Sequence, residues 1–300
     1  MGDLIIALEG TPAGATAAVL LALAAAILHA VFGALQKGRH DPWISRAAID
    51  LWLIVLALPL ILLVPWPEPQ LLPILAGAMA IHFAYKVLQA LAYSRGAYTV
   101  VYPVVRGTGP LFTVLGAWVL FGEAFAPGQW AGLLVLLAGI FGLAGYNYAR
   151  LAEGRATLGP AMGYAVATGL FVALYTTYDA WGIRASADPF TFLAWFFLLT
   201  AFDMPLLVAL GPLRARLSGV ALRPLLIRGL IGALVAFGSF GGIMLATRLG
   251  PVGQAAVLRE TSTVFAALIG WLMLGEKTGP RRVALMALIA TGAVVVQVAG

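Results

Sequence analysis

Cysteine is absent from the 300 residues of this chain, and only 10% of them are charged. The absence of cysteine excludes disulfides, thiolate nucleophiles and metal sites built on cysteine. The three histidines lie far apart, and the chain has neither an HExxH zinc motif nor the glycine-rich phosphate loop of ATP-driven proteins. We therefore expect no catalytic residue, no bound metal and no cofactor.

Long polar stretches are also missing, since the longest are roughly a dozen residues. What is present is apolar: 62% of the residues are hydrophobic, and the mean hydropathy is +0.99. Apolar runs of about 20 residues recur along the chain, and a helix of that length crosses about 30 Å of hydrocarbon. The composition predicts an all-α membrane protein, in which any function must reside within the helix bundle.

The net charge of +6 comes from basic residues scattered through short loops. A nucleic-acid-binding protein would instead gather them into a stripe interleaved with exposed aromatic residues, so we expect no nucleic-acid partner. Loop charge that sets the orientation in the membrane is the better interpretation. The start of the chain, with Asp3 and Glu9 and no basic segment, does not resemble a cleaved signal peptide.

Apolar runs between glycine, proline and charged residues predict ten membrane helices. Short breaks between several of them imply tight antiparallel hairpins. The predicted ranges are 14–35, 44–64, 71–94, 98–121, 129–149, 159–182, 190–211, 224–247, 252–274 and 281–299.

The two halves of the sequence match each other at a fixed offset of 153 positions. VVRGTGPLFTVLGAWVLFGE, residues 104–123, aligns with VLRETSTVFAALIGWLMLGE, residues 257–276. Rare residues recur at this offset, namely Arg106 with Arg259, Trp118 with Trp271, Glu123 with Glu276, Asp50 with Asp203, and Arg95 with Arg248. We therefore predict two five-helix repeats, residues 1–150 and 151–300.

An odd number of helices in each repeat predicts that the second repeat is inverted relative to the first. Inverted repeats around a central cavity are a recurring architecture of secondary transporters. The loops after the odd-numbered helices carry thirteen lysines and arginines against two on the other face, which predicts that both termini lie outside. The thirteen are Lys37, Arg39, Arg46, Arg95, Arg150, Arg155, Arg214, Arg216, Arg223, Arg228, Lys277, Arg281 and Arg282, and the two are Arg184 and Arg248.

The end of each aligned segment has a distinctive pattern, in which Pro110 or Thr263 precedes Gly-Glu and a glycine-containing apolar helix follows at 130–145 or 283–296. This pattern resembles the EamA repeat of the drug/metabolite transporter superfamily, over nearly the whole chain. The resemblance implies a ten-helix bundle that exports amino acids or related metabolites across a bacterial inner membrane, with exporters of aromatic amino acids as the nearest match. Two features depart from the family: Thr263 replaces a proline, and its usual arrangement does not have both termini outside.

Arg106 and Arg259 are predicted to lie well inside their helices. An ionised side chain at a helix centre costs about 2.5–3.5 kcal/mol on insertion scales, which makes both arginines functional candidates. A guanidinium suits the carboxylate of an amino-acid substrate. The alternative is a gate or a structural ion pair with Glu260, Asp179 or Asp203.

Glu260 adjoins Arg259 in the otherwise uncharged segment AAVLRETSTVF. Successive helical residues point in different directions, so the two need not be partners. The repeat equivalent of Glu260 is Gly107, which has no side chain. We expect Glu260 to anchor a helix contact or an arginine, with substrate or proton binding as the alternative.

A polar stripe follows one face of the third predicted helix, formed by His82, Lys86, Gln89 and Tyr93, with Tyr85 beside it. Such a stripe must face a cavity or another helix, because lipid cannot satisfy it. We take His82, Tyr85, Lys86 and Gln89 as candidate substrate-binding residues, with a proton relay as a further role for His82. Inter-helix hydrogen bonding is the alternative.

Three more candidate substrate-binding residues are Tyr102, Tyr175 and Asp179. Tyr102 precedes Arg106 in a helix that two prolines are predicted to bend. Tyr175 and Asp179 share one helix face, where Asp179 could receive a substrate ammonium group or remain a solvated interfacial carboxylate. Aromatic lining would suit apolar amino-acid side chains.

We interpret three other polar residues as structural. His29 is expected to be a buried, hydrogen-bonded histidine, and Glu123 and Glu276 are expected to start the helix that follows each of them.

The sequence as a whole predicts a secondary exporter of amino acids or similar zwitterionic metabolites, working as a monomer or weak homodimer with a small-molecule substrate in the lipid bilayer. The alternatives are a channel and an intramembrane enzyme acting on a small polar or lipid substrate.

Overall fold

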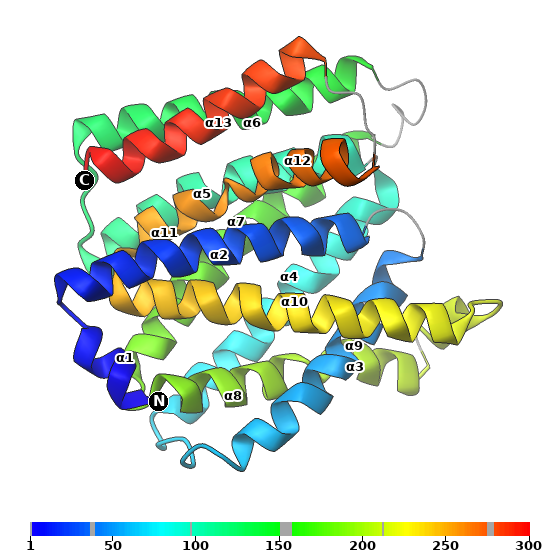
Figure 1. Ribbon diagram of the computed structural model, residues 1–300. Coiled ribbons are helices and arrows are strands. Elements are labelled where there is room, and N and C mark those ends of the chain that lie inside the picture. Colours follow the sequence, from blue (N-terminus) through cyan, green and yellow to red (C-terminus); the bar gives the residue numbers. More distant parts are fainter. Residues whose placement is uncertain (1, 37–39, 97, 151–157, 212, 275–278) are drawn as a thin grey trace.

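The computed structural model describes residues 2–36, 40–96, 98–150, 158–211, 213–274 and 279–300. These residues form helices and no β-strand (Figure 1). The first half contains α1 Gly2–Leu8, α2 Pro12–Gln36, α3 Pro42–Ile61, α4 Leu71–Arg95, α5 Tyr98–Phe121 and α6 Pro127–Ala149. The second half contains α7 Leu158–Ala185, α8 Pro189–Thr200, α9 Asp203–Ala209, α10 Leu222–Leu249, α11 Val252–Arg259, α12 Ser262–Leu274 and α13 Pro280–Val298.

Prolines mark the starts of several helices, because the first helical residue needs no N–H partner. The helices that begin on a proline are α2, α3, α6, α8 and α13. The side chain of Asp41 accepts hydrogen bonds from the amides of Trp43 and Ile44, and the side chain of Asp188 accepts one from the amide of Thr191. These helices therefore start one or two residues before the predicted positions.

Two of the predicted helices are wrong as single elements. The segment predicted at 190–211 is divided into α8 and α9 by a turn at Ala201–Phe202, and the one at 252–274 is divided into α11 and α12 at Glu260–Thr261. The short helix α1 was also not predicted. Apolar periodicity reports the length of a buried segment, but it does not detect a local change in backbone hydrogen bonding.

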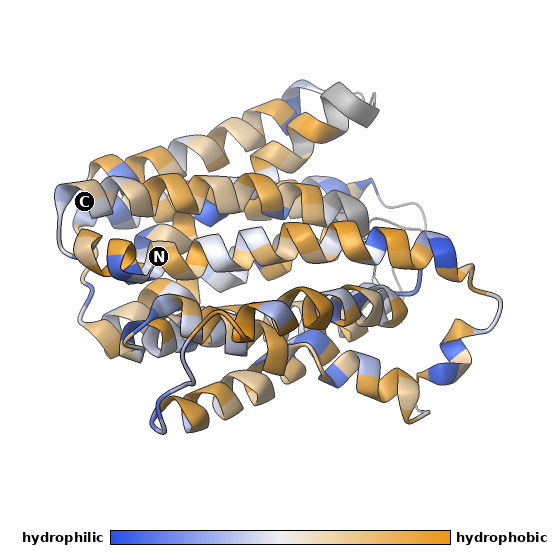
Figure 2. Cartoon of the chain, turned by 60° about the horizontal axis from the view of Figure 1, so that its bottom comes forward, coloured by the Kyte–Doolittle hydropathy of each residue, from blue (hydrophilic) through white to orange (hydrophobic). Residues whose placement is uncertain are grey.

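Nine helical segments among the described residues are long and apolar enough to cross a membrane, with α8 and α9 counted as one. The divided segment of α11, with 8 residues, and α12, with 13 residues, is not among them. Large apolar side chains such as Leu62, Val119 and Val294 are exposed on the outside, as lipid contact requires. Hydrophilic residues lie mostly near the helix ends and in the connections (Figure 2).

The contacts between the two halves are reciprocal. Helix α2 packs along α10 and helix α4 packs along α7, which pairs the first predicted helix of each half with the third of the other. In the same way, α5 contacts α7 while α11 and α12 contact α2. Helices α6 and α13, which are repeat equivalents, pack together at one edge (Figure 1).

Glycines allow α6 and α13 to approach closely. A Cβ atom at Gly292 would lie 2.6 Å from the carbonyl oxygen of Gly132, and one at Gly139 would lie 2.9 Å from that of Leu285. Close approach through small residues is typical of helix pairs in membranes. Gly139 and Gly292 are separated by the repeat offset, so both halves use the same device.

Candidate functional site

Most of the candidate site residues lie together in the middle of the bundle, on α4, α5 and α7 and at the end of α11. His82, Arg106, Asp179, Arg259 and Glu260 are all buried. Burying charged groups is costly unless they have partners. The partners therefore reveal which of these groups are structural and which remain available.

Arg106 is held by four groups. Its Nε lies 2.8 Å from Oε2 of Glu260, which is ion-pair distance although the N–H does not point along this line. Its Nη2 donates to the hydroxyl of Ser262 at 3.0 Å and to the carbonyl oxygen of Arg259 at 3.1 Å. Its Nη1 lies 3.3 Å from Nε2 of His29.

In this arrangement the His29 ring is neutral and Nε2 carries no proton. A guanidinium can only donate hydrogen bonds, so Nε2 of His29 must accept and the ring proton must reside on Nδ1. The His29 ring also packs against Phe32 and Phe240, with centroids 5.9 and 6.4 Å away. The interpretation of His29 from the sequence as a buried histidine agrees with this position.

The carbonyl of Arg259 is available because the helix is broken there. In a continuous helix it would accept from the amide of Thr263, but that amide donates to the carbonyl of Glu260 at 3.1 Å. The hydroxyls of Thr261 and Thr263 also bond carbonyls three residues back. Threonine hydroxyls compete with the helical ladder in this way, which explains a break without proline.

Asp179 and His82 form a second buried pair. Nε2 of His82 lies 2.8 Å from Oδ2 of Asp179. The other carboxylate oxygen, Oδ1, is buried and has no hydrogen-bond partner among the described residues. Asp179 is therefore not the solvated interfacial carboxylate that the sequence allowed.

Aromatic rings surround this pair. The His82 ring packs against Tyr175 and Phe196 at 4.7 and 4.9 Å, and Tyr175 packs against Tyr85 at 5.0 Å. Nε2 of Gln89 donates to the hydroxyl of Tyr85 at 2.6 Å. The candidates Tyr85, Gln89 and Tyr175 thus belong to one cluster with His82 and Asp179.

Arg259 has very different surroundings from its equivalent Arg106. Its guanidinium lies over the Tyr175 ring at 6.0 Å. Within the described part of the chain its side chain makes no ion pair, and its Nε has no hydrogen-bond partner. It is a buried cation that is only weakly compensated.

Arg259 and Asp179 line the same small space. Its other lining residues are Tyr175, Thr176, Phe240, Ile243, Met244 and Thr247. The space offers about 10 Å³ to the centre of a water molecule, which corresponds to roughly one water. In this structure the space between α7, α10 and α11 has no room for a larger molecule.

Lys86 lies in a separate cluster with carboxylates from both repeats. Its Nζ is 2.8 Å from Oδ2 of Asp50 and 2.8 Å from Oδ1 of Asp203, and it also donates to the carbonyl of Thr200. Arg46 binds the other oxygen of Asp50 at 2.9 Å. Asp50 and Asp203 are repeat equivalents, so a single lysine joins the same position of the two halves.

Two candidates, Asp203 and Tyr102, do not line the space between Arg259 and Asp179. Asp203 belongs to the Lys86 cluster, away from the Arg106–Glu260 pair. Tyr102 is partly buried on α5, one turn before Arg106. Their roles, and the substrate-binding role of Lys86, remain predictions.

The end of the bundle that carries the termini is tied together by two arginines. Arg184 binds the carbonyls of Thr247 and Gly250 at 2.8 and 2.9 Å. Arg248 binds the carbonyls of Ile183 and Ser186 and pairs with Glu9. These contacts join the end of α7 to the end of α10 and, through Glu9, to the segment after α1.

The expectation for Glu123 is wrong in its choice of helix. Its carboxylate accepts hydrogen bonds from the amides of Val252 and Gly253, the start of α11, at 3.0 and 3.1 Å. The following helix, α6, begins at Pro127, and the side chain of Gln129 binds the amide before it. Glu123 therefore caps a helix of the other repeat. Glu276 lies outside the described residues.

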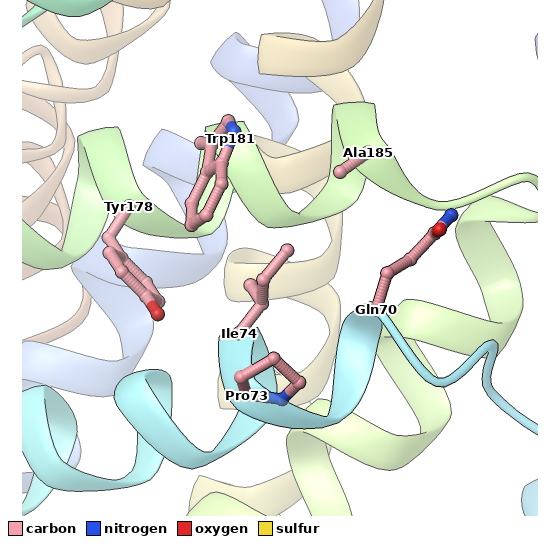
Figure 3. Close-up of a pocket in the computed structure, with 6 residues that line it drawn as sticks. All are labelled: Gln70, Pro73, Ile74, Tyr178, Trp181 and Ala185. Carbon is pink, nitrogen blue, oxygen red and sulfur yellow. The ribbon is translucent and has the colours of Figure 1, made fainter.

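A larger groove of about 350 Å³ lies elsewhere, between the start of α4 and the end of α7. It is lined by Gln70, Pro73, Ile74, Tyr178, Trp181 and Ala185 (Figure 3). None of these side chains is charged, so the groove lacks a group that could hold an ionic substrate. The chemically equipped site is the smaller central space.

Sequence reasoning missed several partners in these clusters, including Asp50, Arg46, Thr200 and Ser262. The recurrence of Asp50 at the repeat offset was a usable signal, since a charge repeated at one position of both halves is rare in an apolar chain. Ser262 gave no comparable signal. Among the described residues, no group of three or more His, Asp or Glu side chains could hold a metal ion.

The comparisons with known proteins agree with the fold and the repeats. No curated protein sequence matches the chain. One solved crystal structure superposes on it with a TM-score of 0.75 at 21% identity, covering 94% of this chain and 99% of the other, which shows the fold alone. The model of the EamA-like transporter family matches residues 16–145 and again residues 159–298. With nine apolar helical segments in its described part and two copies of this repeat, the chain is a multi-pass membrane protein and belongs to the EamA-like transporter family.

Proposed function

We propose that the protein is a secondary transporter that exports amino acids or related small zwitterionic metabolites by alternating access. The observation that carries this proposal is the pairing of Arg259 and Asp179 on one central space. Each of these two side chains has a buried polar atom without a partner among the described residues. A molecule with a carboxylate and an ammonium group would supply both missing partners.

The aromatic surroundings favour a substrate with an apolar or aromatic side chain. Tyr175 and Phe240 line the space, and their ring centroids lie 6.1 Å apart. Pockets for small molecules are typically apolar with a few placed polar groups. Aromatic amino acids are therefore the first substrates to test.

Alternating access requires the closed space to open, and the repeats provide a means. We infer ten crossings, with α11 and α12 together forming the tenth, and a second repeat inverted relative to the first. The in-line course of α11 and α12, the position of both termini at one end of the bundle (Figure 1) and the reciprocal contacts between the halves support this arrangement. Rocking of inverted repeats opens a central site to each side in turn.

The loop charges support an orientation with the termini outside, in a bacterial inner membrane. The predicted helix ranges assign thirteen of the eighteen lysines and arginines to the face opposite the termini. The site is formed within one chain, so a monomer is sufficient for transport. A channel is the alternative function, but a central space for about one water provides no continuous path.

Transport by purified protein in liposomes tests the proposal. We expect saturable uptake of one or more labelled amino acids, with aromatic ones first, and competition by unlabelled amino acids. An amino-acid amide, which lacks the carboxylate, and a deaminated acid, which lacks the ammonium group, should compete at least tenfold more weakly.

Arg259→Gln and Asp179→Asn should each lower transport at least tenfold. Arg223→Gln, an exposed arginine at the start of α10, is the matched control and should transport normally. Wild-type rates and apparent affinities in both site variants would show that the zwitterion site is wrong. Flux that neither saturates nor is competed would favour a channel.

A further inference from the structure

Arg106 and Arg259 share an unusual backbone feature. In an α-helix the carbonyl of residue i accepts from the amide of residue i+4. For Arg106 that residue is Pro110, which has no N–H. For Arg259 it is Thr263, whose N–H binds the carbonyl of Glu260 instead. The carbonyls of Arg106 and Arg259 therefore both lack the usual i+4 amide donor, because of a proline in one repeat and a threonine in the other.

The carbonyl of Arg259 receives a hydrogen bond from the side chain of its repeat equivalent, Arg106. Nη2 of Arg106 donates to the carbonyl of Arg259 at 3.1 Å, a contact between equivalent positions of the two repeats. The reciprocal contact, from the Arg259 guanidinium to the carbonyl of Arg106, is not made. The Arg259 guanidinium lies over Tyr175 and lines the central space.

We propose that the two arginines exchange these roles when the transporter changes its open side, so that in the opposite state Arg259 donates to the carbonyl of Arg106. This inference rests on the proposed function, because it requires inverted repeats that exchange conformations. A buried carbonyl without a donor is costly in a membrane protein. Each state therefore gains by satisfying one of the two carbonyls through the arginine of the other repeat.

Arg259 has fewer contacts to break than Arg106 when the roles are exchanged. Arg106 is paired with Glu260 at 2.8 Å, whereas the repeat equivalent of Glu260 is Gly107 and offers Arg259 no such partner. In the opposite state the Arg259 guanidinium leaves the substrate space for the carbonyl of Arg106. A substrate carboxylate and this carbonyl thus compete for one guanidinium, which couples substrate release to the conformational change.

Pro110→Ala tests the exchange without changing either arginine. The new amide supplies the carbonyl of Arg106 with an ordinary helical donor and removes the acceptor that Arg259 needs in the opposite state. Pro103→Ala is the matched control, since it makes the same change about two turns earlier in α5. It restores a helical donor to the carbonyl of Thr99 instead of the carbonyl of Arg106. We expect Pro110→Ala, but not Pro103→Ala, to favour the present state.

The readout is a single engineered thiol in a chain without cysteine. Thr247 is 2% exposed, lines the central space, and its carbonyl is bound by Arg184 at the terminus end. Thr247→Cys should react with a membrane-impermeant maleimide only when this end opens. Adding Pro110→Ala should lower the labelling rate at least threefold, whereas adding Pro103→Ala should change it by less than a factor of 1.5.

Arg259→Gln provides a second test. It should also lower the labelling rate, and in its presence Pro110→Ala should have no further effect, because both changes remove one contact. Equal rates for Pro110→Ala and Pro103→Ala, or an undiminished Pro110→Ala effect in the Arg259→Gln background, would overturn the exchange. So would a T247C protein that transports but is never labelled.

The labelling experiment needs no substrate, and it therefore fails independently of the transport experiment. Transport of zwitterions without the expected labelling pattern would leave the proposed function intact and refute the exchange. The expected labelling pattern without transport of any zwitterion would refute the substrate class and keep the exchange.

Discussion

Arg106 and Arg259 occupy the same position in the two repeats, yet their surroundings give them different roles. Arg106 is bound to Glu260, Ser262 and the carbonyl of Arg259. The guanidinium of Arg259 lies over the Tyr175 ring, and its side chain makes no ion pair among the described residues. The sequence left substrate binding and ion pairing open for both, and the contacts favour ion pairing for Arg106 and substrate binding for Arg259.

This difference predicts that Arg106→Gln destabilises the protein much more than Arg259→Gln does. Arg106→Gln leaves the buried Glu260 carboxylate without its partner, and breaking a buried ion pair costs about 3–5 kcal/mol. Arg259→Gln leaves no carboxylate unpaired, so its free energy of unfolding should change by less than about 1 kcal/mol. Thermal unfolding in detergent measures both variants, and Arg106→Gln combined with Glu260→Gln should recover most of the loss. Equal melting temperatures for the two single variants would contradict the division of roles.

Lys86 is expected to be structural, because carboxylates of both repeats bind it. Lys86→Met leaves Asp203 without its cation and Asp50 with Arg46 alone, and we expect a loss of about 3 kcal/mol. Combining it with Asp50→Asn and Asp203→Asn removes the uncompensated charges and should restore much of the melting temperature. A triple variant that folds and still transports would exclude a substrate role for Lys86, whereas a folded but inactive one would support it.

The residues of the site were better predicted than their partners. The polar stripe on α4 was recognised from helical spacing, but its members separate: His82 meets Asp179 on α7, while Lys86 meets Asp50 and Asp203. A helix face is wide enough to contact two neighbouring helices. Which neighbour each side chain meets depends on packing between segments far apart in sequence, and periodicity alone does not contain that information.

At the scale of helices, the sequence predicted membrane segments well and their interruptions poorly. Most predicted boundaries lie within three residues of the observed ones. The two prolines of α5 do not divide it, since the helix runs without a break from Tyr98 to Phe121, and the bend expected there stays a prediction. The interruption occurs instead in the other repeat, where the hydroxyls of Thr261 and Thr263 bond nearby carbonyls. Such hydroxyl bonds are too common in membrane helices to predict a break.

The pairing of α6 with α13 depends on glycine at the contact. A Cβ atom in Gly292→Ala would lie 2.6 Å from the carbonyl oxygen of Gly132 on the other helix, so the helices must separate. Overpacking of this kind costs about 1–3 kcal/mol. The matched control is Gly145→Ala, also on this helix pair, where a Cβ atom would meet nothing within 4 Å. We expect the melting temperature in detergent to fall for Gly292→Ala only, and equal values would show that this contact tolerates expansion.

At the scale of the whole molecule, the repeats explain why rare residues of the sequence meet in space. Asp50 and Asp203 converge on Lys86, and Arg106 contacts Arg259, across the offset of 153 positions. A pseudo-two-fold arrangement brings equivalent positions near its axis to one another. Two of the charged pairs that recur at this offset therefore meet inside the bundle, whereas Arg248 and Glu123, which also have repeat equivalents, bind groups near helix ends.

Orientation in the membrane is the last property to test, and loop charge alone predicts it. The two termini lie at the same end of the bundle (Figure 1), and Arg184 and Arg248 are the basic residues that the sequence assigns to that face. Because Lys and Arg are retained on the cytoplasmic side, the termini should be outside. A C-terminal alkaline phosphatase fusion, active only outside the cytoplasm, should then be active, and a fluorescent-protein fusion that matures in the cytoplasm should be dark. The reverse pattern would place the face to which the sequence assigns thirteen lysines and arginines outside the cell. The end of the bundle with the termini, Arg184 and Arg248 would then be the cytoplasmic one.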